Sequence, residues 1–103
     1  MATYCFDIDG TLFKTLGSDY PNSQPLPRRI AVVNRLYEEG HEITLFTARG
    51  AHSGIDWREL TEEQLLRWGV RYHRLILGKP HADLYIDDKG VSDRDFFLEA
   101  DSS

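Results

Sequence analysis

The segment TYCFDIDGTLF, residues 3–13, ends a strand-like pattern in a pair of carboxylates. Its aromatic and β-branched residues predict a β-strand over Thr3–Ile8. Asp7 and Asp9 are separated by one residue where this strand ends, so both carboxylates can face the same side of the chain. Gly10 allows the backbone to turn close beside them. The segment therefore predicts a strand that carries two acids at its carboxyl end.

Hydrophobic periodicity divides the rest of the chain into helices and strands. Residues 13–27 contain Gly17 and three prolines, so we expect an irregular flap there. Apolar residues three or four positions apart predict two amphipathic helices, Arg28–Glu39 and Arg58–Trp68. Short apolar runs predict three further strands, Glu42–Thr47, Arg74–Leu77 and Leu84–Ile86. We expect a short final helix over Asp93–Ala100 and fraying of the last residues, Asp101, Ser102 and Ser103.

Strands that alternate with helices favour right-handed crossovers and a mainly parallel sheet. We therefore expect an α/β fold with a single Rossmann-like, doubly wound sheet and helices on both faces. Separate cores usually need about 100 residues each, and the sequence has 103 residues. One domain over residues 1–103 is expected, with its core in about residues 3–90 and without a cap domain.

The composition argues against several kinds of partner. The sequence has 12 Lys and Arg against 17 Asp and Glu, a formal net charge of −5, whereas non-specific nucleic-acid binding needs clustered basic residues. No apolar run approaches the roughly 20 residues of a membrane span, and the N-terminal residues lack a secretory pattern. We expect a cytoplasmic protein without a nucleic-acid or membrane partner. Its single cysteine, Cys5, is expected to be a small core residue.

Polar residues follow each predicted strand at its carboxyl end. Asp7 and Asp9 follow the first strand, Thr47 closes the second and Lys79 follows the third. Asp87-Asp88 follows the fourth. Ligands of open parallel sheets bind beyond the carboxyl ends of the strands, so we expect these side chains to share one rim.

These residue types suit phosphoryl transfer. Two close carboxylates repel each other unless a cation lies between them, and Mg²⁺ prefers oxygen ligands. One carboxylate can attack phosphorus while the other protonates the leaving oxygen and later deprotonates water. The hydroxyl of Thr47 can donate to a phosphate oxygen, and Lys79 brings a positive charge. The sequence thus contains the groups for an aspartyl-phosphate mechanism.

Four ordered segments resemble the motifs of the haloacid dehalogenase (HAD) superfamily of aspartate-nucleophile phosphohydrolases. They are FDIDGTLF (Phe6–Phe13), TLFTARG (Thr44–Gly50), LGKP (Leu77–Pro80) and YIDDKG (Tyr85–Gly90). The first motif is specific in itself, and the other three gain weight from their order and spacing. The resemblance spans about residues 3–90, which is most of the chain.

The resemblance implies a role for each matching residue. Asp7 would be the nucleophile and a metal ligand, and Asp9 the general acid/base with its backbone carbonyl on Mg²⁺. Asp88 would bind the metal directly, and Asp87 directly or through water. Thr47 and Lys79 would complete the catalytic set. The residues expected around the phosphate are Gly10, Thr11, Thr47, Ala48, Arg49 and Lys79, although Arg49 could instead bind a carbonyl near its own turn.

The function implied is a Mg²⁺-dependent phosphatase of the capless HAD branch. Its expected substrate is a small phosphorylated metabolite, a phosphate monoester of the phosphosugar type. Without a cap, selectivity would come from the 13–27 flap, the 51–56 loop or a neighbouring subunit of a homo-oligomer that completes the active site. The roles of His52 and His81, near the rim, stay open. Two alternatives remain: a nucleotide or nucleic-acid-end phosphatase, and a non-enzymatic phospho-ligand-binding or regulatory protein on the same fold.

Overall fold

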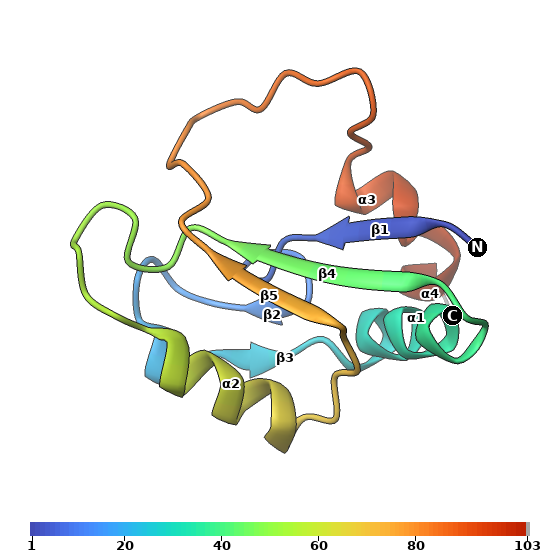
Figure 1. Cartoon of the computed structure of the whole chain (residues 1–103), viewed down its shortest axis with the longest axis horizontal. Helices are drawn as coiled ribbons and strands as arrows, with labels where there is room; N and C mark the ends of the chain where they lie inside the picture. Colours follow the sequence, from blue (N-terminus) through green and yellow to red (C-terminus); the bar gives the residue numbers. More distant parts are fainter. Residues whose placement is uncertain (103) are drawn as a thin grey trace.

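Three parallel strands form the larger of the two sheets in the described residues, in the order β1-β4-β5 (Figure 1). The computed structural model describes residues 1–102. Its elements, in chain order, are β1 (Thr3–Phe6), β2 (Phe13–Lys14), the 3-10 helix η1 (Tyr20–Asn22), β3 (Gln24–Pro25), α1 (Pro27–Glu38), β4 (Glu42–Thr47), α2 (Arg58–Arg67), β5 (Arg74–Leu77), α3 (Asp93–Phe96) and α4 (Leu98–Ser102). The predicted α/β fold, with a parallel sheet and helices, is confirmed, and the described residues 1–102 include no cap domain.

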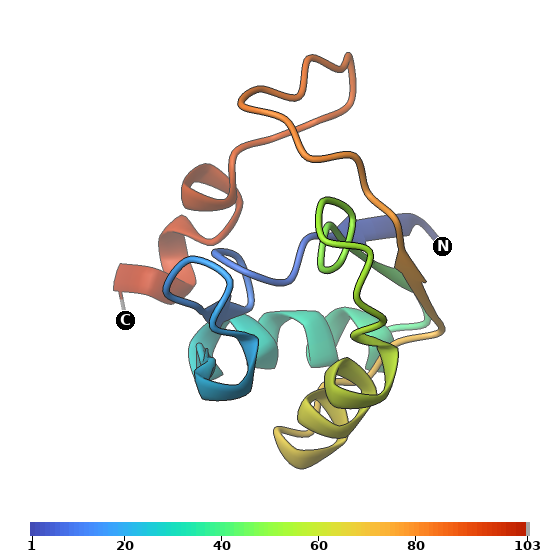
Figure 2. The ribbon, with the colours of Figure 1, turned by 90° about the vertical axis from the view of Figure 1, so that its left-hand side faces the viewer.

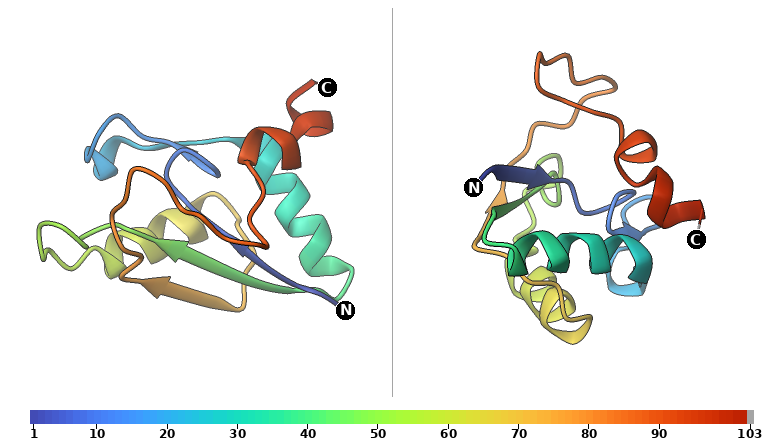
Figure 3. Two further views of the ribbon diagram at one scale, coloured as in Figure 1. Left: turned by 90° about the horizontal axis from the view of Figure 1, so that it is seen from above. Right: turned by 90° about the vertical axis from the view of Figure 1, so that its right-hand side faces the viewer.

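The register of the strands places the core on one face of the sheet. Phe6 of β1 pairs with Leu45 of β4, and Leu45 pairs with Leu75 of β5. Paired residues of neighbouring strands point to the same face, so these side chains form one apolar layer. The buried residues Val33 of α1 and Leu65 of α2 join it. Figure 3 shows both helices on this side of the sheet.

Cys5 points the other way. It lies between the core residues Tyr4 and Phe6, and successive side chains of a strand alternate between faces. The thiol is exposed, so the prediction of a core cysteine is wrong.

The prediction of a fourth strand over Leu84–Ile86 is also wrong. Residues 78–92 form an irregular arch that leaves the sheet after β5 (Figures 1 and 2). Leu84 is 77% exposed and Ile86 is 94% exposed, so neither side chain gains the burial that stabilises a strand. Among residues 1–102, only β4 pairs with β1.

The C-terminal residues are tied to α1. The predicted helix 93–100 is interrupted at Phe97, which separates α3 from α4 and is 1% exposed. The Arg29 guanidinium forms ion pairs with Asp93 at 2.6 Å and with Asp101 at 2.7 Å. The expected fraying of Asp101 and Ser102 is therefore wrong, whereas Ser103 lies outside the described residues.

The residues that the structure describes include no helix long and apolar enough to cross a membrane.

The flap predicted over residues 13–27 carries a small antiparallel pair of strands, in which Phe13 faces Pro25. Leu26 donates its amide to the Leu12 carbonyl at 2.9 Å, which holds the far end of the flap against its beginning.

We expect Phe97→Ala to lower the free energy of unfolding by about 3–5 kcal/mol, because it leaves a cavity beneath the C-terminal helices. The Phe97 ring packs 6.0 Å from the Phe6 ring and 4.9 Å from the Arg29 guanidinium. Urea unfolding would measure the change, with Leu98→Ala as control, because Leu98 is 63% exposed. Equal losses in the two variants would contradict this packing.

Candidate active site

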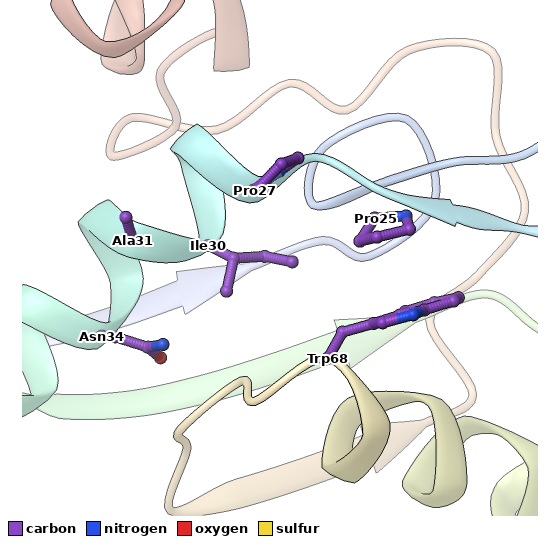
Figure 4. Close-up of a pocket in the computed structure, with 6 residues that line it drawn as sticks. All are labelled: Pro25, Pro27, Ile30, Ala31, Asn34 and Trp68. Atoms are coloured by element: carbon purple, nitrogen blue, oxygen red, sulfur yellow. The ribbon is translucent and has the colours of Figure 1, made fainter.

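The loops that follow β1, β4 and β5 surround a cavity of about 680 Å³. Asp7 and Asp9 come from the first loop, Ala48 and Arg49 from the second, and Lys79 from the third. The carboxyl ends of parallel strands meet at one edge of a sheet, which brings these distant residues together. A hollow of about 340 Å³ between α1, β3 and Trp68 has a lining without ionisable side chains (Figure 4). The larger cavity is therefore the candidate for chemistry.

Asp7 faces Lys79 across the cavity. The Lys79 Nζ lies 3.7 Å from an Asp7 carboxylate oxygen, and 35% of the Asp7 side chain is exposed. Burial raises the pKa of Asp7 above its ordinary value of 3.8, while the charge of Lys79 opposes the rise. A desolvated carboxylate beside one cation is suited to react with an electron-poor centre, because little water must be removed from it.

The turn after Asp7 is closed by its own backbone. Thr11 donates its amide to the Ile8 carbonyl at 3.1 Å, and Gly10 donates to the Phe13 carbonyl at 2.8 Å. Gly10 has a φ of 85°, a backbone conformation that residues with a Cβ rarely adopt. Gly10 and Thr11 were expected around the phosphate, but in this structure both of their amides are bonded within the turn.

Thr47 joins the ends of β4 and β5. It is 1% exposed, and its carbonyl accepts a hydrogen bond from the Lys79 amide at 3.1 Å. Its hydroxyl oxygen accepts from the Arg49 amide, also at 3.1 Å. Lys79 is thereby fixed at its backbone next to β4, which explains why its side chain reaches Asp7.

Asp9 is held by Arg49. The guanidinium donates from Nε to Asp9 Oδ2 at 2.9 Å and from Nη2 to Asp9 Oδ1 at 2.8 Å. The Thr15 hydroxyl, from the flap, donates to the same Oδ1 at 2.6 Å. Arg49 is buried, and its partners are side chains. The alternative given above, a backbone carbonyl near its own turn, is not one of them.

Asp87 and Asp88 lie outside the cavity. Both are exposed on the 78–92 arch, where the Lys89 amide donates to Asp87 at 3.0 Å and lowers the pKa of that carboxyl. Without the predicted fourth strand, nothing carries them to the rim beside Asp7. Within residues 1–102 no three His, Cys, Asp or Glu side chains are grouped to hold a metal ion.

The four predicted carboxylates are therefore not gathered into one Mg²⁺ site in this structure. Mg²⁺ is bound through one or two carboxylates together with water and phosphate oxygens. Asp7 can supply one such oxygen, but the Asp9 carboxylate is bound to Arg49 and Asp87 and Asp88 are remote. Their roles as ligands stay predictions.

Three aromatic residues line the cavity. Tyr20 comes from the flap, Trp57 precedes α2 and Tyr85 comes from the arch. The Tyr20 and Trp57 rings meet edge to face at 5.1 Å, and the Lys79 ammonium lies 4.3 Å from the Tyr85 ring centroid. The sequence did not mark Tyr20, Trp57 or Tyr85 as site residues. Tyr85 opens the fourth motif, but its place beside Lys79 depends on tertiary contacts that the motif does not reveal.

His52 and His81 also line the cavity. Their rings lie 6.3 Å apart, although the residues belong to the loops after different strands. The loops after β4 and β5 thus each contribute one imidazole to the lining of the cavity.

Comparison with known proteins supports the fold. No family model and no curated protein matches the sequence. A solved structure from Vibrio cholerae, a structural genomics target, has a TM-score of 0.82 at 29% identity, covering 99% of this chain and 95% of that one.

Two further solved structures are longer than this chain. One, from the Pnkp1/Rnl/Hen1 complex, has a TM-score of 0.60 at 25% identity, covering 95% of this chain and 33% of that one. D,D-heptose 1.7-bisphosphate phosphatase from B. bronchiseptica, complexed with magnesium and phosphate, has a TM-score of 0.58 at 20% identity, covering 98% of this chain and 64% of that one. These likenesses support a HAD-like fold.

We expect Asp7→Asn to stabilise the protein at neutral pH. Because the pKa of Asp7 is raised in the folded state, the folded protein binds more protons than the unfolded chain between 3.8 and the raised value. The free energy of unfolding therefore falls as the pH rises through that window. At higher pH the carboxyl is ionised, and the loss of stability from burying its charge stays constant. Asparagine carries no such cost.

Urea unfolding at two pH values would check this sign. The midpoint of Asp7→Asn should exceed that of the parent at about pH 7, and the difference should vanish near pH ~3, where the carboxyl is protonated in both states. Asp83→Asn removes an exposed charge and should change neither midpoint. A lower midpoint for Asp7→Asn at neutral pH would contradict the desolvation of Asp7.

Proposed function

We propose that this protein is a phosphatase that hydrolyses a small phosphate monoester through an aspartyl-phosphate on Asp7. The observation that carries the proposal is the pairing of Asp7 with Lys79 inside a cavity where a second acid, Asp9, is fixed nearby. The likeness of fold to a heptose bisphosphate phosphatase supports it.

The proposed reaction has two steps on this chain's own residues. An Asp7 oxygen attacks phosphorus and the bond to the leaving oxygen breaks, while Asp9 gives that oxygen a proton. Water then attacks the acyl phosphate, Asp9 takes its proton, and inorganic phosphate leaves. Lys79, 3.7 Å from Asp7, offsets the negative charge that gathers during both steps. A phosphate contact by the Thr47 hydroxyl is also part of the proposal, and it requires a shift at the rim, because Thr47 is 1% exposed and does not line the cavity.

Magnesium is the proposed cofactor, on the strength of a neighbour that was solved with magnesium and phosphate. When bound, the ion would neutralise phosphate charge and orient the ester. Asp7 and the backbone carbonyl of Asp9 are the oxygens that could hold it in this structure. Asp87 and Asp88 could join them only if the 78–92 arch approached β1, because both are exposed outside the cavity.

A phosphosugar is the proposed class of substrate. The cavity of about 680 Å³ lies within the roughly 300–1,000 Å³ typical of small-molecule sites. Tyr20, Trp57 and Tyr85 present aromatic surface on which the C–H face of a sugar can pack. The flap and the 51–56 loop both contribute to this lining, as expected of a chain without a cap domain.

Two alternatives are weaker. A chain of the Pnkp1/Rnl/Hen1 RNA repair complex shares the fold at 22% identity, so a nucleic-acid-end phosphatase is retained as an alternative. The net charge of −5 counts against it. A non-enzymatic phospho-ligand-binding protein would have no need of an acid/base held as firmly as Asp9. A neighbouring subunit that completes the site also remains a proposal.

We expect the parent protein to release phosphate from a generic aryl phosphate in the presence of Mg²⁺, and to lose that activity with a chelator. Asp7→Asn removes the attacking oxygen and Asp9→Asn the proton donor, so each should lower turnover by a factor of about 100 or more. Asp83→Asn serves as the charge-matched control. Parent activity that survives either active-site substitution would remove this mechanism.

A comparison of substrates separates the alternatives. We expect kcat/KM for a panel of sugar phosphates to exceed that for 3′-phosphorylated oligonucleotides by about tenfold or more, because the acidic chain repels a polyanion. The reverse order would establish the nucleic-acid-end activity. Binding of phosphate esters without turnover of any of them would establish the non-enzymatic alternative.

A further inference from the structure

The Arg49 guanidinium makes five hydrogen bonds inside the protein. Besides the two bonds to Asp9, Nη1 donates to Thr61 Oγ1 at 3.0 Å and to Gln64 Oε1 at 2.6 Å, and Nη2 donates to Ser23 Oγ at 3.3 Å. An arginine side chain has five N–H donors, so none is left for a ligand. This arrangement leaves no donor for the phosphate contact that the sequence suggested for Arg49.

The partners of Arg49 are themselves fixed. Thr61 and Gln64 belong to α2 and are 0% and 1% exposed. The Thr61 hydroxyl donates to the Trp57 carbonyl at 2.7 Å, and the Gln64 amide donates to the Tyr20 carbonyl at 2.7 Å. The guanidinium therefore has one orientation, set by α2.

The flap closes the other side of the guanidinium. The Tyr20 ring lies 4.7 Å from its central carbon. The hydroxyls of Ser23 and Thr15 are 2.7 Å apart, and Thr15 is the third donor to the Asp9 carboxylate. Asp9 thus receives three hydrogen bonds from groups that the flap and α2 hold in place.

We infer that Arg49 is the positioning residue of Asp9. This inference rests on the proposed role of Asp9 as general acid/base. The bidentate pair fixes the plane of the carboxylate, and it stabilises the negative charge that Asp9 acquires once its proton has passed to the leaving oxygen. One carboxylate lone pair beyond the three hydrogen bonds stays available for that proton, since a carboxylate has about four acceptor sites.

Leaving groups of different basicity separate positioning from structural support. An alkoxide needs a proton in order to leave, whereas 2,4-dinitrophenolate leaves without one, so only the alkyl ester depends on a well-placed acid. Single-turnover measurements isolate the first step, in which the leaving group departs. The ratio of the two rates therefore reports on Asp9 alone.

In Arg49→Lys, which keeps the charge but not the bidentate pair, we expect the first-step rate to fall about 100-fold with an alkyl phosphate and less than about fivefold with 2,4-dinitrophenyl phosphate. Gln64→Leu, which keeps the guanidinium and removes one anchor, should shift the ratio in the same direction by about tenfold and stands in if Arg49→Lys does not fold. Val33→Ala, in the remote core, should lower stability and leave the ratio unchanged.

Equal loss of both rates in Arg49→Lys and Gln64→Leu would overturn the inference while leaving the proposed function intact. A second measurement does not depend on activity. NMR couplings should show one χ1 rotamer for Asp9 in the parent and in Val33→Ala, and averaging in the Arg49 or Gln64 variant. If the parent hydrolyses neither ester, the proposed function fails, and an Asp9 rotamer unaffected by these substitutions would overturn the positioning role as well.

Discussion

The arrangement of this site depends on one buried arginine, Arg49. Taking a guanidinium out of water is costly unless its charge is paired and its donors are used. Arg49, 2% exposed, meets both conditions through Asp9, two side chains of α2 and one of the flap. These four groups come from parts of the chain that share no hydrophobic repeat, so the cation joins elements that the core alone would not align. The loop after β1, the end of β4, α2 and the flap consequently form one unit.

This unit gives the two acids of the first motif opposite surroundings. Asp7 is partly desolvated and has Lys79 at 3.7 Å, whereas Asp9 is bound by two guanidinium nitrogens and a hydroxyl. Pairs of titratable groups in contrasting environments are how one site carries out two kinds of proton and nucleophile chemistry. Asp7 and Asp9 are separated by a single residue, so the contrast comes from the tertiary contacts of each carboxylate. Gly10, with its positive φ, forms the turn that follows them.

Local pattern was enough to predict β4, β5, α1 and α2, since each carries its own periodicity and end signals. It failed at Leu84–Ile86, where the apolar run has the composition of a strand, but the side chains are exposed and pairing would not be stabilised by burial. It also failed at Phe97 and Asp101, which depend on Arg29, more than 60 residues away. The role of Arg49 was underestimated for the same reason, because a side chain whose partners lie between residues 9 and 64 has no local signature.

The proposed mechanism depends on Asp7 as the residue that carries the phosphoryl group. Rapid acid quench during turnover, followed by peptide mass spectrometry, tests it directly, because an acyl phosphate survives in acid long enough to be located. We expect a phosphorylated peptide containing Asp7, with more of it accumulating in Asp9→Asn when an aryl phosphate supplies the leaving group. Turnover with no phosphorylated peptide, or with phosphate on another residue, would contradict it.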